Sequence, residues 1–224
     1  MPSILITGAG RGLGLEFARQ YAAAGWTVVA GVRDPSRASG LAEFTAETVA
    51  LDMADPRSIR QAADRLAGRS FDVLLNNAGL YGESQQFGHI GEEEWERVMR
   101  VNAISPLKMA EAFLPHLLAG QKKLMVFLTS RMGSIADNGS GGAYIYRSSK
   151  AALNAAVKSL SIDLAPRGVT ALLLHPGWVK TDMGGPNAMI PAEESIAGMR
   201  RLIEAAEPGQ PLKFLDYRGT PLPW

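Results

Sequence analysis

The feature that most constrains the fold is a short apolar run near the start of the chain, which stops at a cluster of glycines. Residues 4–7 are apolar and partly β-branched, as in a buried strand, and Gly-Ala-Gly-Arg-Gly-Leu-Gly follows at residues 8–14. Helical periodicity begins directly afterwards. Such a turn lets the backbone approach a pyrophosphate, and free amides at the helix N-terminus bind its charge. The pattern predicts the start of a dinucleotide-binding domain. A turn that only closes a helix onto a strand is the alternative.

The spacing of these glycines is unusual for a dinucleotide site. It reads Thr-Gly-x-x-x-Gly-x-Gly, beginning at Thr7 and running through Gly8, Gly12 and Gly14. The common fingerprint G-x-G-x-x-G is not met, because no glycine stands three positions after Gly10. The motif therefore needs support from the rest of the chain.

Strand-like and helical patterns alternate along that remainder. Strand-like runs lie at residues 26–32, 48–52, 71–75, 124–129, 169–174 and 212–215. Helical patterns lie at residues 55–67, 92–101, 107–118, 145–165 and 196–203, with an expected interruption at Asn102. This alternation predicts an α/β fold, a Rossmann-like doubly wound parallel sheet of about seven strands with helices on both faces. We expect one domain over residues 1–224, with a short substrate loop around residues 184–192.

Composition excludes several classes of function. The chain has 23 basic and 22 acidic residues, so it carries no basic footprint for nucleic acid. It has no cysteine, and its three histidines lack metal-ligand spacing, so we expect no disulfide and no metal site. No apolar run is long enough to cross a membrane, and no signal peptide is evident. We therefore expect a cytoplasmic protein that binds neither nucleic acid nor membrane.

The end of the second strand indicates which dinucleotide is bound. Arg33 follows Val32 at this strand end, where the adenosine ribose is read, and a guanidinium pairs well with a 2′-phosphate. Arg11, inside the glycine-rich turn, is a second cation that could reach the same phosphate. Asp34 stands where an acceptor for a 2′-hydroxyl is expected, which keeps NAD(H) as the alternative. Two arginines favour NADP(H) over NAD(H).

Other strand ends contribute polar or small residues to the same edge. Asp52 and Met53 follow the third strand, where Asp52 either sits over the adenine or simply ends the strand. Asn76 begins Asn-Asn-Ala-Gly at the end of the fourth. In open parallel sheets ligands bind at the carboxyl ends of the strands, so these motifs agree on one cleft.

The chemistry is predicted at Tyr146-x-x-x-Lys150. On a helix, residues four apart share a face, so a phenol and an ammonium can meet there. An ammonium about 4 Å away would favour the phenolate by roughly 4 kcal/mol, about three pKa units. This would move the pKa of Tyr146 towards neutrality, where a general acid or base works best. Tyr144 cannot form such a pair, because Ser148 and not lysine stands four residues after it.

Taken together, these motifs resemble the short-chain dehydrogenase/reductase family along nearly the whole chain. The motifs are Thr7-Gly8-x-x-x-Gly12-x-Gly14, Asn76-Asn77-Ala78-Gly79, Asn102, Ser130, Tyr146-x-x-x-Lys150 and Pro176-Gly177-x-x-x-Thr181. Their order and spacing are far more specific than any one of them. Residues 130–138 further resemble the branch that contains C-factor and sniffer-type carbonyl reductases.

The resemblance implies a catalytic tetrad of Asn102, Ser130, Tyr146 and Lys150. Tyr146 would pass a proton to or from the substrate oxygen while the nicotinamide passes a hydride at the carbon. Lys150 would depress the tyrosine pKa and hold the nicotinamide ribose. Ser130 would hydrogen-bond the substrate oxygen, and Asn102 would keep a water that links Lys150 to solvent. The residues expected to contact the cofactor are Gly8, Arg11, Gly12, Leu13, Gly14, Arg33, Asp52, Met53, Asn76, Ala78, Gly79, Tyr146, Lys150, Pro176, Gly177, Val179 and Thr181.

The serine is where the chain departs from the family pattern. The family places it about a dozen residues before the tyrosine, whereas Ser130 lies sixteen before Tyr146 and Ser134 lies twelve before it. Spacing alone favours Ser134. Ser130, however, lies at a strand end and is followed by x-x-Gly, as the family serine is. We therefore prefer Ser130 as the catalytic serine.

The resulting hypothesis is an NADP(H)-dependent oxidoreductase that interconverts a carbonyl and an alcohol, working as a carbonyl reductase on a small molecule. The resemblance also implies a homo-oligomer, dimer or tetramer, assembled through the helices at residues 105–119 and 145–165. The alternative, carried by the C-factor likeness, is a cofactor-binding signalling or regulatory protein with little turnover.

Overall fold

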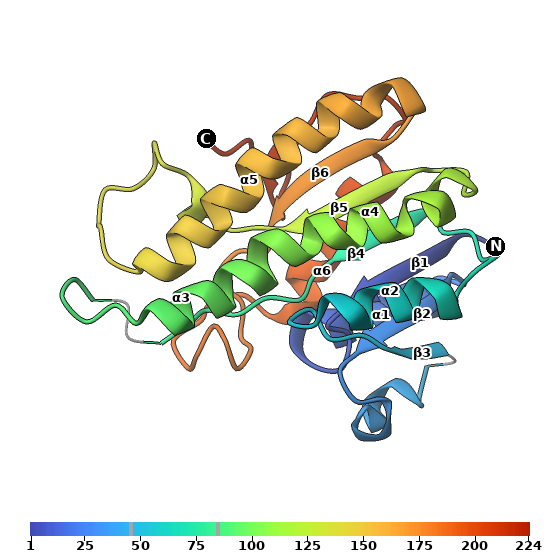
Figure 1. Cartoon of the computed structure of the whole chain (residues 1–224), viewed down its shortest axis with the longest axis horizontal. Coiled ribbons are helices and arrows are strands. Elements are labelled where there is room, and N and C mark those ends of the chain that lie inside the picture. The colour runs from blue at the N-terminus through green and yellow to red at the C-terminus, as the bar shows by residue number, and fades with distance from the viewer. Residues whose placement is uncertain (45–46, 84–85) are drawn as a thin grey trace.

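A computed structural model describes residues 1–44, 47–83 and 86–224. Within these residues, seven parallel strands form one sheet in the order β3-β2-β1-β4-β5-β6-β7 (Figure 1). The strands are β1 (Ser3–Thr7), β2 (Thr27–Val32), β3 (Glu47–Ala50), β4 (Val73–Asn76), β5 (Leu124–Leu128), β6 (Thr170–His175) and β7 (Lys213–Asp216). The predicted doubly wound sheet is confirmed. The order reverses between β1 and β4, which opens a crevice at their carboxyl ends.

Helices cover both faces of the sheet. They are α1 (Gly12–Ala23), α2 (Pro56–Arg65), α3 (Glu92–Met99), α4 (Ser105–Leu118), α5 (Tyr144–Leu164) and α6 (Ala192–Glu204). Apolar residues of α1 and α6 join one core cluster, and those of α2, α4 and α5 join the other. Figure 1 shows α4 and α5 side by side on the near face.

Alternation along β1 explains why two cores form. Ile4 and Ile6 pack into the core beneath α1 and α6, whereas Leu5 packs into the core beneath α2, α4 and α5. Successive side chains of a strand point to opposite faces, so a strand buried on both faces is apolar throughout. The continuous apolar runs in the sequence therefore correspond to central strands.

The expected interruption of the helix at Asn102 is wrong. A π-helical segment, Arg100–Ile104, joins α3 to α4, so that the chain stays helical from Glu92 to Leu118. A π turn accommodates one extra residue without breaking a helix, and such turns often lie at functional sites. Asn102, fully buried, is in this turn.

Among the described residues, no helix is long and apolar enough to cross a membrane.

Candidate active site

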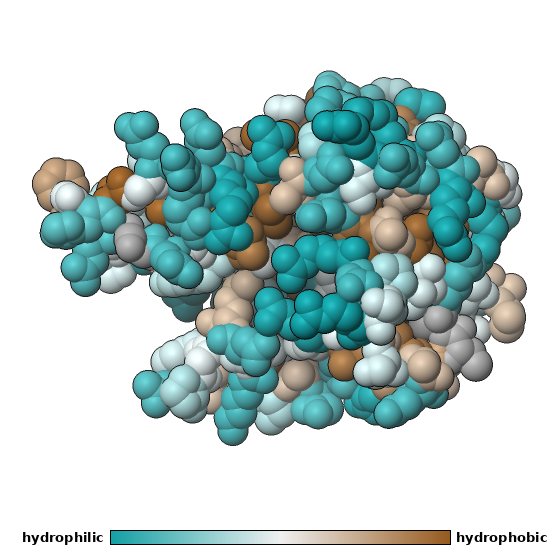
Figure 2. Space-filling model, turned by 60° about the horizontal axis from the view of Figure 1, so that its bottom comes forward, coloured by the Kyte–Doolittle hydropathy of each residue, from teal (hydrophilic) through white to brown (hydrophobic). Residues whose placement is uncertain are grey.

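The predicted site residues lie at the carboxyl ends of the strands. Figure 2 shows a notch on this side of the molecule, between a lobe built on α3 and the loop before it and a second lobe formed by the loop between β6 and α6. The glycine-rich turn, the end of β4 and the start of α5 converge on this edge of the sheet.

Two glycines of the glycine-rich turn, Gly8 and Gly14, are packed too tightly for a side chain. Gly8 has a φ of +67°, and a Cβ on Gly14 would lie 2.2 Å from the carbonyl oxygen of Gly8. Asn77 holds the turn, because its Nδ2 donates to the carbonyl oxygens of Thr7 at 2.8 Å and Gly8 at 3.2 Å. Leu13 is partly buried against the core beneath α1. The sequence places Asn77 in the Asn-Asn-Ala-Gly motif, which is expected to line the cofactor cleft, and the structure adds that this side chain holds the glycine-rich turn.

Asn76 tests whether the cleft suits a dinucleotide. It ends β4, is 3% exposed, and neither polar atom of its amide has a hydrogen-bond partner among the residues described. A buried polar group without a partner is costly, so such an amide is suited to a ligand. Ala78 lies against Gly8, and Gly79 lies near the Lys150 ammonium. The glycine turn and this amide together fit a bound dinucleotide.

The residues after β2 distinguish the hypothesis of NADP(H) binding from that of NAD(H) binding. Arg33 is exposed there. The carboxylate of Asp34 accepts hydrogen bonds from the Ser36 amide at 3.0 Å and the Ser36 hydroxyl at 2.6 Å, and these bonds lower the pKa of Asp34. Asp34 therefore caps the short turn Pro35–Arg37.

The two residues after β3 have different environments. Asp52 is half-buried, and its Oδ1 accepts a hydrogen bond from the Ala54 amide at 2.9 Å. Met53 is buried in the core, with its carbonyl oxygen bonded to the Ser105 hydroxyl. Of these two residues, only Asp52 has a partly exposed side chain.

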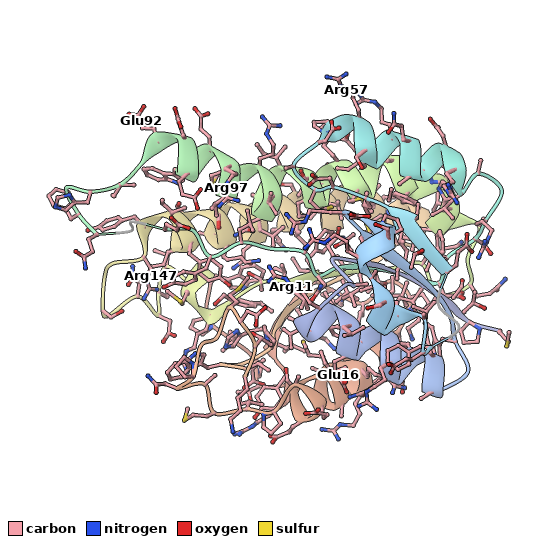
Figure 3. All side chains as sticks on the ribbon, turned by 90° about the horizontal axis from the view of Figure 1, so that it is seen from below. Arg11, Glu16, Arg57, Glu92, Arg97 and Arg147 are labelled. Carbon is pink, nitrogen blue, oxygen red and sulfur yellow. The ribbon has the colours of Figure 1, made fainter. Side chains whose placement is uncertain are left out.

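Arg11 pairs with a residue that the sequence reading did not consider. Its Nη1 lies 3.0 Å from Oδ2 of Asp182, and both side chains are largely exposed, at 73% and 83%. Figure 3 shows Arg11 at the amino end of α1, on the side from which the loops project. The ion pair joins the glycine-rich turn to the loop after β6.

That loop is folded back on the end of β6. Gly177 has a φ of +85°, and a Cβ there would lie 2.3 Å from Cδ1 of Ile190. Val179, buried, pairs with Ile190 as an isolated bridge, and the Thr181 side chain lies beside Gly12. The carbonyl oxygen of Pro176 accepts a hydrogen bond from the Ser195 hydroxyl at 2.6 Å. Of the residues expected to contact the cofactor from this loop, Thr181 therefore lies beside the glycine-rich turn, whereas Pro176, Gly177 and Val179 contact Ser195 and Ile190.

Ser130 and Tyr146 are in contact. Ser130 lies two residues beyond β5, Tyr146 lies in the first turn of α5, and their hydroxyls are hydrogen-bonded. The Ser130 hydroxyl also accepts a bond from the Met132 amide at 3.1 Å. Ser134 has other partners, since its hydroxyl donates to the Trp224 carbonyl oxygen and accepts from the Asp137 amide.

Lys150 is one turn along α5 and is buried, at 4% exposed. Its ammonium donates to the carbonyl oxygen of Leu128 at 2.9 Å and lies 5.8 Å from the centroid of the Tyr146 ring. Burial lowers the pKa of Lys150 to about 8, because a low-polarity environment disfavours its charge.

The pKa of Tyr146 moves in the direction opposite to our expectation. Burial raises it to about 12, the hydrogen bond from Ser130 lowers it, and the nearby Tyr81 raises it. The expected net fall of this pKa is wrong for these side chains, because desolvation of the buried phenolate is the largest effect. Tyr146 is therefore a protonated phenol at neutral pH.

Asn102 connects the loop after β4 to α5. Its Oδ1 accepts from the Leu80 amide and its Nδ2 donates to the Leu80 carbonyl oxygen, both at 2.8 Å. Its Nδ2 also lies 3.0 Å from the hydroxyl of Ser149, which donates to the Tyr146 carbonyl oxygen at 2.8 Å. One amide thus positions segments that carry two tyrosines, Tyr81 and Tyr146.

Tyr81 is a site residue that the sequence reading missed. Its ring centroid lies 4.8 Å from that of Tyr146 with an angle of 39° between the planes, and 43% of its surface is exposed. The only signal was the position of Tyr81, two residues after Asn-Asn-Ala-Gly. Tyr144, rejected from the sequence, packs instead near Phe87, with ring centroids 6.2 Å apart.

A doubly wound sheet with this glycine turn and this serine, tyrosine and lysine defines an NAD(P)-dependent oxidoreductase. Residues 2–189 match the family model described as short chain dehydrogenase. The chain belongs to this family, as the sequence motifs predicted.

Individual relatives agree with the family assignment. C-signal of Myxococcus xanthus is 47% identical over 166 residues, which are 74% of this chain and all of that protein. The NADPH-bound carbonyl reductase from chicken fatty liver has a TM-score of 0.90 and 33% identity, covering 100% of this chain and 99% of its own. Carbonyl reductase Sniffer of D. melanogaster has a TM-score of 0.90 and 31% identity, covering 100% of both chains.

Proposed function

We propose that the protein is an NADP(H)-dependent carbonyl reductase, in which Asn102, Ser130, Tyr146 and Lys150 form the catalytic group. The observation that carries the proposal is the hydrogen bond between Ser130 and a buried, protonated Tyr146, with Lys150 one turn away. Its likeness to two carbonyl reductases supports the same reaction.

The residues would act as follows. NADPH, when bound, supplies a hydride to the carbonyl carbon. Tyr146 donates its phenolic proton to the carbonyl oxygen, which Ser130 also hydrogen-bonds, so that an alcohol results. A pKa of about 12 keeps Tyr146 protonated at neutral pH, so the phenol has a proton to donate. Lys150 would hold the nicotinamide ribose from beside Gly79 and supply charge that stabilises the tyrosinate left behind.

The preference for NADP(H) rests on the end of β2. Arg33 is exposed and free to meet a 2′-phosphate, whereas the carboxylate of Asp34 is engaged by Ser36. A carboxylate at this place would otherwise favour a 2′-hydroxyl and repel a phosphate. An NADPH-bound relative at 33% identity supports the same preference.

Turnover of carbonyl compounds with NADPH tests this proposal. Purified protein with NADPH and a panel of aldehydes, ketones and quinones should consume the cofactor, measured by its absorbance. Tyr146→Phe should lower kcat by about 10²- to 10⁴-fold, the usual contribution of general acid catalysis. Binding of NADPH to the variant, measured by fluorescence, serves as the control. Unchanged turnover in Tyr146→Phe would contradict the assignment.

The second candidate is a cofactor-binding signalling or regulatory protein with little turnover. The observation that favours it is the 47% identity to C-signal. Binding of NADPH without turnover of any carbonyl on the panel would support this candidate over the enzyme.

We also propose that copies of the chain assemble into a dimer or tetramer through α4 and α5, which lie side by side on one face (Figure 1). Ile104 and Ile162, at 45% and 60% exposed, place apolar side chains near that face. Light scattering after gel filtration tests this, and a monomer at all concentrations would exclude it.

A further inference from the structure

Ser134, the serine that spacing favoured, has its own pattern of contacts. It is 2% exposed, its hydroxyl donates to the carbonyl oxygen of Trp224 at 3.2 Å, and it accepts from the Asp137 amide at 3.0 Å. The Ala136 amide donates to the same carbonyl oxygen at 2.9 Å. Two donors from one loop thus hold the last residue of the chain.

The segment that carries Trp224, residues 219–224, is held in place by β7. Gly219, with a φ of +94°, reverses the chain, and the Asp216 amide donates to the Thr220 carbonyl oxygen at 2.9 Å. The Leu222 amide donates to the Phe214 carbonyl oxygen at 2.9 Å, and the ring of Trp224 lies 5.7 Å from that of Phe214. Residues 219–224, which we call the tail, therefore run back along the last strand. Figure 1 shows the C-terminus at the same end of the sheet as the loop after β5.

The loop after β5 lies between this tail and α5. A Cβ on Gly133 would lie 2.8 Å from Cβ of Lys150, so the loop backbone lies directly on the catalytic helix. The carbonyl oxygen of Gly133 also accepts a bond from Asn154 at 3.4 Å. The loop is therefore held by α5 on one side and by Trp224 on the other.

Ser130 and Ser134 flank one short 3₁₀ turn, Arg131–Gly133. The Gly133 amide donates to the Ser130 carbonyl oxygen at 2.8 Å, and the Ser134 amide donates to the Arg131 carbonyl oxygen at 3.0 Å. An ion pair between Arg131 and Asp137 closes the outer side of the loop. Because the turn is short and fully bonded, a displacement of Ser134 displaces Ser130.

We propose that Ser134 and Trp224 are positioning residues, which tether the tail to the loop after β5 and thereby hold Ser130 against Tyr146. The tail also borders a cavity of about 200 Å³, lined by Leu222 together with Arg131 and Gly177. The tether thus fixes one wall of this cavity. The predicted effect on turnover rests on the proposed function. The predicted effect on the contact between Ser130 and Tyr146 does not.

The experiment compares four variants. Ser134→Ala removes the donor to Trp224, and Trp224→Ala removes the ring from Phe214. Trp224→Phe keeps an aromatic ring there. Ser140→Ala removes an exposed hydroxyl of the same loop that accepts a bond from Arg147 and makes none to Trp224, so it controls for the loss of a loop hydroxyl as such. The readouts are kcat, the Kd for NADPH, the melting temperature, and the ring resonance of Tyr146 in protein with isotope-labelled tyrosine, assigned with Tyr146→Phe.

Ser134→Ala and Trp224→Ala should each lower kcat about tenfold, since small misplacement of a catalytic group is costly, and should leave the Kd for NADPH within about twofold. Both should shift the Tyr146 resonance, because its bond to Ser130 changes. Trp224→Phe and Ser140→Ala should match the parent protein. Wild-type kcat and an unmoved resonance in Ser134→Ala would overturn the proposal, as would a loss of kcat that only follows a loss of folded protein.

A parent protein without carbonyl turnover would instead contradict the proposed function. The resonance of Tyr146 would then decide the tether alone: a shift in Ser134→Ala and Trp224→Ala supports it, and no shift overturns it.

Discussion

The two halves of the sheet's carboxyl edge hold their polar side chains in opposite ways. Near β1 and β2, Arg11 and Arg33 are exposed, and the one ion pair described for Arg11 lies in solvent. Near β5 and α5, Asn102, Ser130 and Lys150 are each buried and hydrogen-bonded to neighbouring segments. The catalytic half is preorganised, and the cofactor half relies on its backbone and on charges that water screens.

This contrast has an energetic consequence. Buried polar groups are costly unless they are fully bonded, so substitutions in the catalytic half should change both stability and kcat. Exposed charges contribute little to stability, so substitutions in the cofactor half should change only affinity, and in a salt-dependent manner. Predictions from the largest effect to the smallest test this division.

Lys150→Met should have the largest effect. It removes the charge beside Tyr146, and kcat should fall by about 10³-fold, the upper range for loss of one preorganised electrostatic group. The same change should raise the free energy of unfolding at neutral pH by about 2 kcal/mol, the relieved cost of burying a charge less the lost bond to Leu128. Activity assays and urea unfolding measure the two effects.

The pH dependence of the free energy of unfolding tests whether the buried charge of Lys150 causes this difference in stability. The pKa of Lys150 falls from 10.5 in the unfolded chain to about 8 in the folded protein. Below pH 8 the folded protein carries the full cost of the buried charge, and this cost disappears as the pH rises from 8 to 10.5, so its contribution to stability increases across that window. The difference in stability between parent and Lys150→Met should therefore shrink there. A difference that stays constant from pH 8 to 10.5 would contradict this explanation.

Asn102→Ala should have the second-largest effect. It removes three hydrogen bonds that connect Leu80 with Ser149, so kcat should fall by about 10²-fold and the free energy of unfolding by about 2–3 kcal/mol. Asn102→Asp is the matched variant, because it keeps the acceptor for the Leu80 amide but cannot donate to the Leu80 carbonyl oxygen. Its effects should be intermediate. If both variants keep the parent kcat, Asn102 does not position the tyrosines.

Arg33→Asp should change affinity alone. The Kd for NADPH should rise about thirty-fold, as expected for a lost bond between charged groups, while the Kd for NADH changes far less. Arg57→Asp is a control with the same change of charge, at a side chain that Figure 3 shows pointing away from Arg11. Melting temperatures of both variants should match the parent. Equal losses for NADPH and NADH would show that Arg33 does not face the 2′-phosphate.

The sequence predicted the fold better than it predicted the interior of the site. Alternating apolar runs predicted the sheet, because strands buried on both faces must be apolar. The pKa of Tyr146 depends on burial, on the bond from Ser130 and on the nearby Tyr81, none of which can be read from the spacing of Tyr146 and Lys150 in the sequence. The helical path through Asn102 depends on a π turn, which has no simple sequence signal.

The two serines illustrate the same limit. Ser134 lies at the expected distance from Tyr146 in sequence, yet its partner is Trp224, ninety positions further along the chain. A contact across that separation depends on how β7 and the tail return to the loop after β5. Spacing within a motif therefore does not identify which of two nearby hydroxyls reaches the tyrosine.

The smallest effect concerns the ion pair between Arg11 and Asp182, and it tests the cofactor half most finely. If Asp182 competes with the cofactor phosphates for Arg11, Asp182→Asn should lower the Kd for NADPH by at most about fivefold, because exposed ion pairs contribute no more than about 1 kcal/mol. The gain should be lost at high salt, where exposed charges are screened. Arg11→Ala should raise the Kd, and in that background Asp182→Asn should have no further effect. Titrations at low and high salt with the four proteins of this cycle measure the coupling. A Kd that Asp182→Asn leaves unchanged at low salt would show that the ion pair does not compete for Arg11, and the contrast between the two halves would then rest on Arg33.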